Sequence, residues 1–223
     1  MAAPGCLRLA SGRFLLDLKG FTLDRTVSGV QLCKSGERGG AMLHARDLSR
    51  RLQQGRRLLL ARACAAAPGV SVLDATAGFG LDGLTLAALG CSVTLCERDP
   101  LVFELLQDGV GRLGPTESEE GEAEVVHAEA RDFLREPRRY DVVYLDPIFP
   151  ERGKTALPGK RARYLAELVG HDTEALEELL ALALARAKKR VVVKRRRLDP
   201  EARKPDFVIQ GRSVRFDVYR AGA

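Results

Sequence analysis

The chain has 223 residues, of which 36 are lysine or arginine and 30 are aspartate or glutamate, so its net charge is +6. Hydrophobic residues make up 45% of the chain and charged residues 30%, a composition that excludes disorder over most of its length. No apolar run reaches the roughly 20 residues of a membrane helix, and no basic segment followed by an apolar one opens the chain. Its five cysteines form no Cys-x-x-Cys pair, which disfavours a disulfide framework or a metal site. We therefore expect a cytoplasmic protein with free thiols, no metal and no membrane partner.

Basic residues are concentrated in two segments. Residues 1–69 contain twelve basic and four acidic residues, and residues 188–204 contain nine basic and two acidic ones. If the fold brings the two segments together, they form a patch that attracts a phosphate backbone without reading its sequence. The alternative is that they are solvated helix faces. Residues 117–124 contain five glutamates and predict a solvated surface loop.

Strands and helices alternate from about residue 70 onward. Short apolar runs that end at glycine, proline or acidic residues predict strands, and longer runs of helical periodicity predict helices. In chain order we expect a strand at 70–75, a helix at 81–89, a strand at 91–96, a helix at 100–110 capped by Asp99, a strand at 124–127, a short helix at 130–135, a strand at 140–145, a helix at 173–188, a strand at 190–194, and a hairpin of strands at 207–210 and 214–219.

This alternation predicts an α/β fold. Apolar strands separated by helices are typical of a doubly wound, Rossmann-like parallel sheet, and the last two strands add an antiparallel hairpin at one edge. Residues 1–65 show no clear core of their own. There we expect a small basic N-terminal extension with one or two short strands within 7–33 and a basic helix at 44–67 that leads into the main domain at 66–223.

Two motifs favour a nucleotide ligand. Asp74-Ala-Thr-Ala-Gly78-Phe-Gly80 follows a predicted strand, and glycines there let the backbone approach a ligand at the start of a helix. Gly78 to Gly83 match the spacing G-x-G-x-x-G, a weak signal that a tight strand–helix turn also gives. Glu97 ends the next predicted strand and can accept hydrogen bonds from both hydroxyls of a ribose. On these two motifs alone, an NAD-dependent oxidoreductase remains an alternative function.

A third motif, Asp146-Pro147-Ile-Phe149-Pro150, follows the predicted strand at 140–145. Asp146 and a nearby backbone carbonyl can accept the two N–H hydrogens of a nucleobase amine, and Phe149 can stack on the base. Such a site works by orientation and charge placement rather than by a strong base. The alternative for this motif alone is an Asp-Pro turn that ends a strand. An NAD-dependent enzyme leaves the motif unexplained.

Together these motifs resemble the bacterial small-subunit ribosomal RNA methyltransferase J family. The resemblance covers about residues 39–219 and is carried by Leu73-Asp-Ala-Thr-Ala-Gly-Phe-Gly80, Glu97-Arg-Asp-Pro100, Asp146-Pro-Ile-Phe-Pro150, Lys154-Thr-Ala-Leu157, Lys160, Arg163, Leu168-Val-Gly170, Lys189-Arg-Val-Val-Val-Lys-Arg195 and Arg215-Phe-Asp-Val-Tyr219. It implies that 66–223 is a methyltransferase domain that uses S-adenosylmethionine. The implied reaction methylates the exocyclic N2 amine of one guanosine of small-subunit (16S) rRNA, with that RNA or the 30S particle as partner.

The resemblance also implies the site residues. The catalytic residues would be Asp146, Pro147 and Phe149. The cofactor-binding residues would be Asp74, Gly78, Gly80, Leu81, Asp82, Glu97, Arg98, Glu129, Ala130 and Asp146. The family typically has Arg-Asp where this chain has Leu81-Asp82, and Asp132 is an alternative partner for the adenine amine.

Candidate contacts to RNA phosphates are Lys154, Lys160, Lys194, Arg195, Arg196 and Arg197, with plain solvation as the alternative. Two further functions stay open. The chain could be a non-catalytic RNA-binding or ribosome assembly module on the same fold, or an N-methyltransferase of another nucleic acid.

Overall fold

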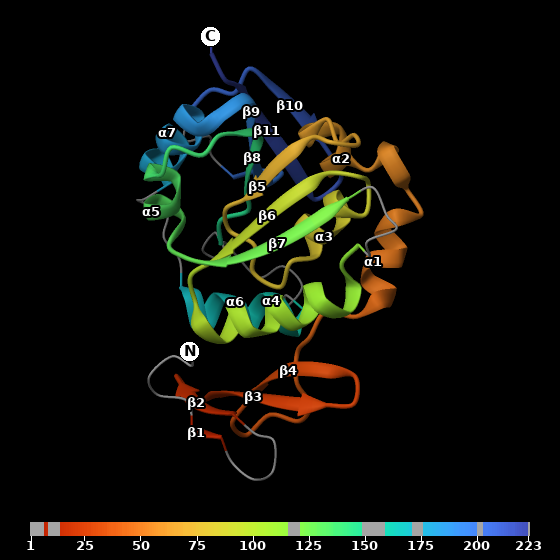
Figure 1. Ribbon diagram of the computed structural model, residues 1–223, viewed down its shortest axis with the longest axis vertical. Helices are drawn as coiled ribbons and strands as arrows, with labels where there is room; N and C mark the ends of the chain where they lie inside the picture. Colours follow the sequence, from red (N-terminus) through yellow and green to blue (C-terminus); the bar gives the residue numbers. More distant parts are fainter. Residues whose placement is uncertain are drawn as a thin grey trace.

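The structure is a computed structural model, which describes residues 7–8, 14–115, 121–148, 159–170, 176–199 and 203–222. It contains a seven-stranded sheet with helices on both faces and, beyond one end of it, a four-stranded antiparallel sheet (Figure 1). Among the described helices, none has the length and apolar character needed to cross a bilayer.

The large sheet confirms the predicted fold. Its strands are, in spatial order, β10 (Phe207–Gln210), β11 (Val214–Arg220), β9 (Ala187–Arg196), β8 (Tyr140–Leu145), β5 (Ser71–Asp74), β6 (Ser92–Glu97) and β7 (Glu122–His127). Strands β5 to β9 pair in parallel, whereas β11 is antiparallel to β9 and to β10. The order reverses between β5 and β8, where ligands bind in sheets of this kind.

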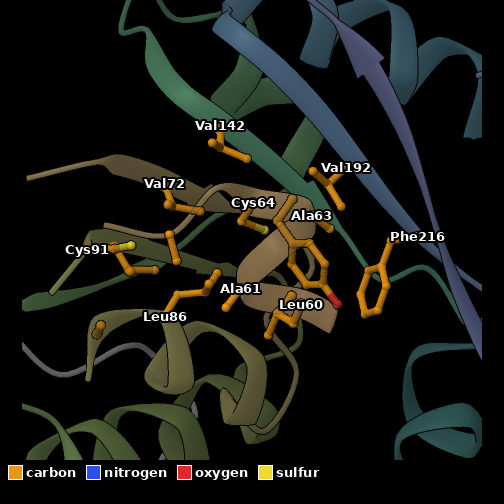
Figure 2. Close-up of a cluster of buried hydrophobic side chains, with 14 of the residues drawn as sticks. Leu60, Ala61, Ala63, Cys64, Val72, Leu86, Cys91, Val142, Val192 and Phe216 are labelled. Atoms are coloured by element: carbon orange, nitrogen blue, oxygen red, sulfur yellow. The ribbon is translucent and has the colours of Figure 1, made fainter. Parts of the chain in front are cut away.

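The central strands are buried on both faces because helices cover each face. On one face Val72 and Val142 pack against α2 (Leu59–Cys64), α3 (Leu81–Ala87) and α4 (Pro100–Leu113). Figure 2 shows this cluster, with Leu60 and Phe216 at its edge. On the opposite face, the next residues of the same strands, Leu73 and Val143, pack against α5 (Ala130–Arg135) and α7 (Leu176–Arg186).

Most predicted boundaries are confirmed within a few residues. The helix at 130–135 and the strand at 140–145 have the predicted bounds, and Asp99 caps α4 by accepting hydrogen bonds from the N–H groups of Leu101 and Val102. Strand β9 is longer than the predicted 190–194 at both ends. Its end pairs with β11 up to Arg196, and its start at Ala187, within the predicted helix 173–188, pairs with Tyr140 of β8. Helix α6 (Lys160–Val169) was not predicted.

The N-terminal region differs from the prediction in two ways. Instead of one or two short strands it has β1 (Leu7–Arg8), β2 (Phe14–Leu18), β3 (Phe21–Thr26) and β4 (Gly29–Lys34). The helix expected at 44–67 is divided into α1 (Ala45–Leu52) and α2 by a 3₁₀ turn at Gly55–Arg57. Gly55 has φ +52°, a conformation that does not continue a right-handed helix.

The N-terminal sheet completes its core with helices of the main domain. Phe21 and Leu32 pack with Leu101 of α4 and with Tyr164 and Leu168 of α6. Charged contacts join the same elements. The guanidinium group of Arg163 on α6 donates to both carboxylate oxygens of Glu37, at 2.7 and 2.6 Å. The division at residue 65 remains a prediction, although apolar contacts cross it.

Candidate functional site

A cleft lies at the carboxyl ends of β5, β6 and β8, beside α5, α6 and α7. It encloses about 750 Å³, counting the part open to solvent. Its lining brings together the predicted residues Gly78, Glu97, Arg98, Glu129, Ala130, Asp146 and Pro147. These residues come from four separate segments of the chain, which lie at the carboxyl ends of β5, β6, β7 and β8, and the parallel sheet places them together because its strands end at one edge.

The glycine turn forms the start of the cleft. Gly78 and Gly80 have φ +54° and +81°, which favour glycine, and α3 begins directly after Gly80. A Cβ atom on Gly80 would lie 2.4 Å from Cδ1 of Leu106, and one on Gly78 would lie 3.0 Å from Cδ2 of Leu165. The turn is therefore closely covered by α4 and α6, and a side chain at Gly80 would displace Leu106.

Glu97 is held in place by backbone groups. Its Oε2 accepts a hydrogen bond from the N–H of Gly78 at 2.9 Å, and its Oε1 accepts one from the N–H of Asp99 at 2.8 Å. Only 6% of the residue is exposed. Burial raises the pKa of the Glu97 carboxyl, although the two N–H donors act in the opposite direction. Each oxygen keeps a lone pair with which it can accept a hydroxyl hydrogen.

Arg98 and Glu129 form an ion pair at the wall of the cleft. Nη1 of Arg98 lies 3.1 Å from Oε2 of Glu129, and Nη2 donates to the carbonyl oxygen of Val169 at 3.2 Å. Arg98 thus connects the end of β6 to the ends of α5 and α6. The alternative adenine partner, Asp132, does not line the cleft; its carboxylate lies 2.6 Å from Nη1 of Arg135.

The predicted catalytic carboxylate, Asp146, lies at the cleft with its side chain 37% exposed. Its backbone N–H donates to Oγ1 of Thr76 at 2.7 Å, which fixes the start of the Asp-Pro turn against the glycine motif. Its Oδ2 lies 2.7 Å from Nζ of Lys194. Partial burial raises the pKa of Asp146, and Lys194 opposes that rise.

Four predicted cofactor residues do not line the cleft: Asp74, Gly80, Leu81 and Asp82. Asp82 is 9% exposed and forms an ion pair with Arg51 of α1, and the hydroxyl of Tyr144 donates to its Oδ2 at 2.6 Å. Burial would raise the pKa of Asp82, but Lys194 and Arg51 lower it below its usual range. Cofactor roles for these four residues remain predictions.

Asp74 lies deeper still, with 1% of the residue exposed. Burial, together with the carboxylates of Asp82 and Asp146, raises the pKa of Asp74 well above its usual range.

Two of the predicted residues, Phe149 and Lys154, lie outside the described residues, so their positions are not assigned. The predicted RNA contact Lys160 forms hydrogen bonds within the protein. Its ammonium group donates to the carbonyl oxygens of Arg38 and Gly39 at 2.7 and 3.0 Å. Lys160 thereby ties the start of α6 to the segment that follows the N-terminal sheet.

Two predicted RNA contacts, Lys194 and Arg195, are held by carboxylates of the protein itself. Arg195 is 3% exposed, and its Nε lies 3.0 Å from Oδ2 of the fully buried Asp217. Lys194 directs its ammonium group to two carboxylates instead of to solvent. Arg196 is partly exposed and pairs with Asp199 at 3.2 Å, whereas Arg197 is exposed. RNA contacts at the end of β9 remain a prediction, which the partly exposed Arg196 and the exposed Arg197 fit best.

Several residues of the site were not predicted from the sequence. Thr76 lies inside the glycine motif, and its hydroxyl could have been identified there as a turn-stabilising group. Leu165 and Val169 line the cleft from α6, whose helical pattern was not recognised. Leu176 and Leu179 of α7 add apolar surface to the lining of the cleft.

Comparisons with known proteins point to one family. A family model described as a putative SAM-dependent methyltransferase matches residues 39–221. The chain is 43% identical over 189 residues to ribosomal RNA small subunit methyltransferase J of Pseudomonas aeruginosa, covering 81% of the chain and 70% of that relative. It is 49% identical over 160 residues to the protein of the same name from Thioalkalivibrio sulfidiphilus, covering 68% of the chain and 62% of the relative. The chain thus matches less than two thirds of the length of the Thioalkalivibrio protein.

Two solved structures extend the comparison. A SAM-dependent methyltransferase from Neisseria gonorrhoeae superposes with a TM-score of 0.69 at 30% identity, covering 87% of this chain and 80% of that one. A T. thermophilus 16S rRNA N2 G1207 methyltransferase in complex with AdoMet and guanosine has a TM-score of 0.51 at 18% identity, covering 90% of this chain and 50% of that one. The second likeness shows the fold alone.

Proposed function

Because this chain belongs to the ribosomal RNA small subunit methyltransferase J family of S-adenosylmethionine-dependent methyltransferases, we propose that it methylates the exocyclic N2 amine of one guanosine of small-subunit rRNA. One observation carries this proposal. Glu97, which suits a ribose, and Asp146-Pro147, which suit a nucleobase amine, line the same cleft.

The donors and acceptors of the cleft fit S-adenosylmethionine. Glu97 offers a buried carboxylate, with its orientation already fixed, to the two ribose hydroxyls. The apolar surfaces of Ala130 and Leu179 suit the adenine ring, and Gly78 lines the cleft without a side chain. Bound there, S-adenosylmethionine supplies a methyl group carried on a positively charged sulfur.

Asp146 would orient the acceptor amine. One of its oxygens, Oδ2, is bound by Lys194, and among the described residues no hydrogen bond is found for Oδ1, which can accept an N–H of guanine. A carboxylate held at this point stabilises the positive charge that the amine nitrogen gains as it is methylated. Because the side chain is 37% exposed, the proton that the methylated amine then releases can pass by way of Asp146 to water.

The RNA would dock beside the end of β9. Arg197 is exposed and lies three residues after Lys194, which contacts Asp146. The backbone N–H of Arg197 donates to the carbonyl oxygen of Ser213, next to the exposed Arg212. The turn between β10 and β11 also touches Leu59 of α2, which brings the exposed Arg57 toward the same place. Arg57, Arg197 and Arg212 would contact phosphates and position the RNA without reading its sequence.

A methylation assay with nucleoside mass analysis tests the proposed function. The full chain would be incubated with methyl-labelled S-adenosylmethionine and with either naked small-subunit rRNA or 30S particles from cells that lack this gene. We expect N2-methylguanosine in one of these substrates, and large-subunit rRNA as a matched control should stay unlabelled. At saturating cofactor, Asp146→Ala should slow the labelling roughly 100- to 1000-fold.

The alternatives would give different results. RNA binding without methyl transfer, in a protein that does not bind the cofactor, would support the non-catalytic assembly module. Label on another RNA, or on a nucleoside other than guanosine, would refute the proposed substrate while leaving the methyltransferase class intact.

A further inference from the structure

Lys194 lies between two carboxylates at the back of the cleft. Its Nζ is 2.7 Å from Oδ2 of Asp146 and 2.9 Å from Oδ2 of Asp82. Asp82 in turn pairs with Arg51 and accepts a hydrogen bond from Tyr144. Positive and negative groups therefore alternate in a row that begins on α1 and ends at the predicted catalytic carboxylate.

We propose that Lys194 is a positioning residue for methyl transfer, which orients the Asp146 carboxylate toward the acceptor amine and keeps it charged. The inference rests on the proposed function, because it assigns Lys194 a part in the reaction that Asp146 would carry out. It also replaces the contact to an RNA phosphate that the sequence had predicted for Lys194.

The sheet itself fixes the position of Lys194. Strands β8 and β9 pair in parallel with Leu145 opposite Val193. The next residue along each chain segment, Asp146 after Leu145 and Lys194 after Val193, is therefore a neighbour of the other. The side chain of Lys194 is only 22% exposed, and its second acceptor, Asp82, is buried. An ammonium group held by two acceptors in this way has little freedom to turn toward solvent, so it restrains Asp146 directly.

The charge around Asp146 explains why a cation is needed there. The titratable and charged groups near its carboxylate are Asp74 on β5, Asp82 on α3, Tyr144 on β8, Arg51 on α1 and Lys194 on β9. Burial and the neighbouring Asp82 raise the pKa of Asp146, whereas Lys194 and the more distant Arg51 lower it. Without the ammonium group of Lys194, Asp146 would take up a proton at a higher pH and could no longer stabilise positive charge on the amine.

The pH dependence of single-turnover methylation at saturating cofactor tests this role. For Lys194→Met we expect the rate at neutral pH to fall by about 10- to 100-fold, the scale of a misplaced catalytic group. The acid limb of the profile should move to higher pH, so that part of the rate returns in alkaline buffer. Lys194→Arg keeps the charge and should keep the acid limb near its wild-type position. Lys189→Met, at the other end of β9 with a 61% exposed side chain, is the matched control and should behave as wild type.

Asp82→Asn should shift the acid limb of the pH profile in the direction opposite to that of Lys194→Met. It removes a negative charge near Asp146 and leaves Lys194 in place, so the acid limb should move to lower pH. Calorimetric titration should give the same cofactor affinity for both Lys194 variants and the wild type. Equal loss of rate at every pH in Lys194→Met, an unchanged rate, or upward shifts in both Lys194→Met and Asp82→Asn would overturn the inference. A wild type that does not methylate small-subunit rRNA would instead refute the proposed function.

Discussion

The N–H of Gly78 donates to Oε2 of Glu97, 19 residues further along the chain, at a distance of 2.9 Å. This contact joins the glycine turn after β5 to the carboxylate at the end of β6. The other carboxylate oxygen is bound to the backbone of Asp99, so the side chain of Glu97 has its orientation before any ligand arrives. A group arranged in advance loses less entropy on binding than one that must be ordered.

Glu97→Ala should therefore weaken S-adenosylmethionine binding by about 1.5–3 kcal/mol, the range for hydrogen bonds to a charged group. Isothermal titration calorimetry measures the change, and a thermal melt checks the fold. Glu104→Ala, an exposed position on α4, is the matched control and should bind the cofactor normally. Unchanged affinity in a folded Glu97→Ala protein would exclude the ribose role.

Asp146→Ala should lower the single-turnover rate of methyl transfer by roughly 100- to 1000-fold, the usual effect of removing a group fixed where charge develops. Asp146→Asn keeps the size and one acceptor oxygen but loses the charge, so we expect it to retain more activity than alanine. Rapid-quench assays at saturating cofactor separate this step from binding. Wild-type rates in Asp146→Ala would leave the Asp-Pro motif as a structural turn only.

Replacing Arg197 and Arg212 together by glutamine should weaken RNA binding and flatten its salt dependence. Each lost contact to a duplex phosphate reduces the log–log slope by about 0.9. Filter binding over a range of salt concentrations measures the slope. Lys188→Gln removes an equally exposed charge at the opposite end of β9 and should leave the slope unchanged. If Lys188→Gln flattened the salt slope as much as the double replacement does, the RNA would not bind preferentially beside the end of β9.

Arg195→Gln should lower the free energy of unfolding, whereas the exposed Arg197 is expected to act on RNA binding. The guanidinium group of Arg195 is buried against Asp217, and loss of one partner of a buried ion pair typically costs about 3–5 kcal/mol. Because Arg215 also pairs with Asp217, the lower end of that range is expected. Chemical denaturation measures the loss. A fully stable variant would show that Arg215 alone satisfies the buried carboxylate.

The ion pair between Glu37 and Arg163 should make stability depend on pH in the acid range. Hydrogen bonds from Arg163 lower the pKa of Glu37 from 4.5 to about 2. A carboxyl with a lowered pKa stabilises the fold above its unfolded pKa, and this contribution disappears as the pH falls through the folded value. The melting temperatures of wild type and Glu37→Gln should therefore differ at neutral pH and converge near pH 2. Glu177→Gln, on the exposed face of α7, should show no such convergence.

Apart from α6, the alternation of strands and helices in the main domain could be predicted because these elements differ clearly in period and end at distinct residues. The placement of Glu97 and Asp146 in one cleft could be predicted in the same way. Glu97 is the last residue of β6 and Asp146 directly follows β8, and parallel strands end at the same edge of the sheet. The division between α1 and α2 was not predicted: Gly55 marks the place in the sequence, but a single glycine within a helical pattern does not tell whether its φ is positive.

The orientation of the residues at the end of β9 could not be predicted either. Alternation of apolar and polar residues normally tells which side chains of a strand face inward. Residues 194–197 are all basic, so that signal is missing. Only the pairing with β11, which is distant in sequence, turns Arg195 toward Asp217 and leaves Arg197 outside.

The shared core of β3, β4, α4 and α6 has a consequence for the modularity of the chain. Helix α6 contributes Leu165 and Val169 to the wall of the candidate cleft, and the neighbouring Tyr164 and Leu168 pack with Phe21 and Leu32 of the N-terminal sheet. Lys19 adds a direct link, because its ammonium group donates to the carbonyl oxygen of Leu168 at 2.6 Å. Truncation of the chain ahead of α1 should therefore expose part of α6 and loosen one wall of the candidate cleft, so we expect the small sheet to support that cleft rather than to be dispensable.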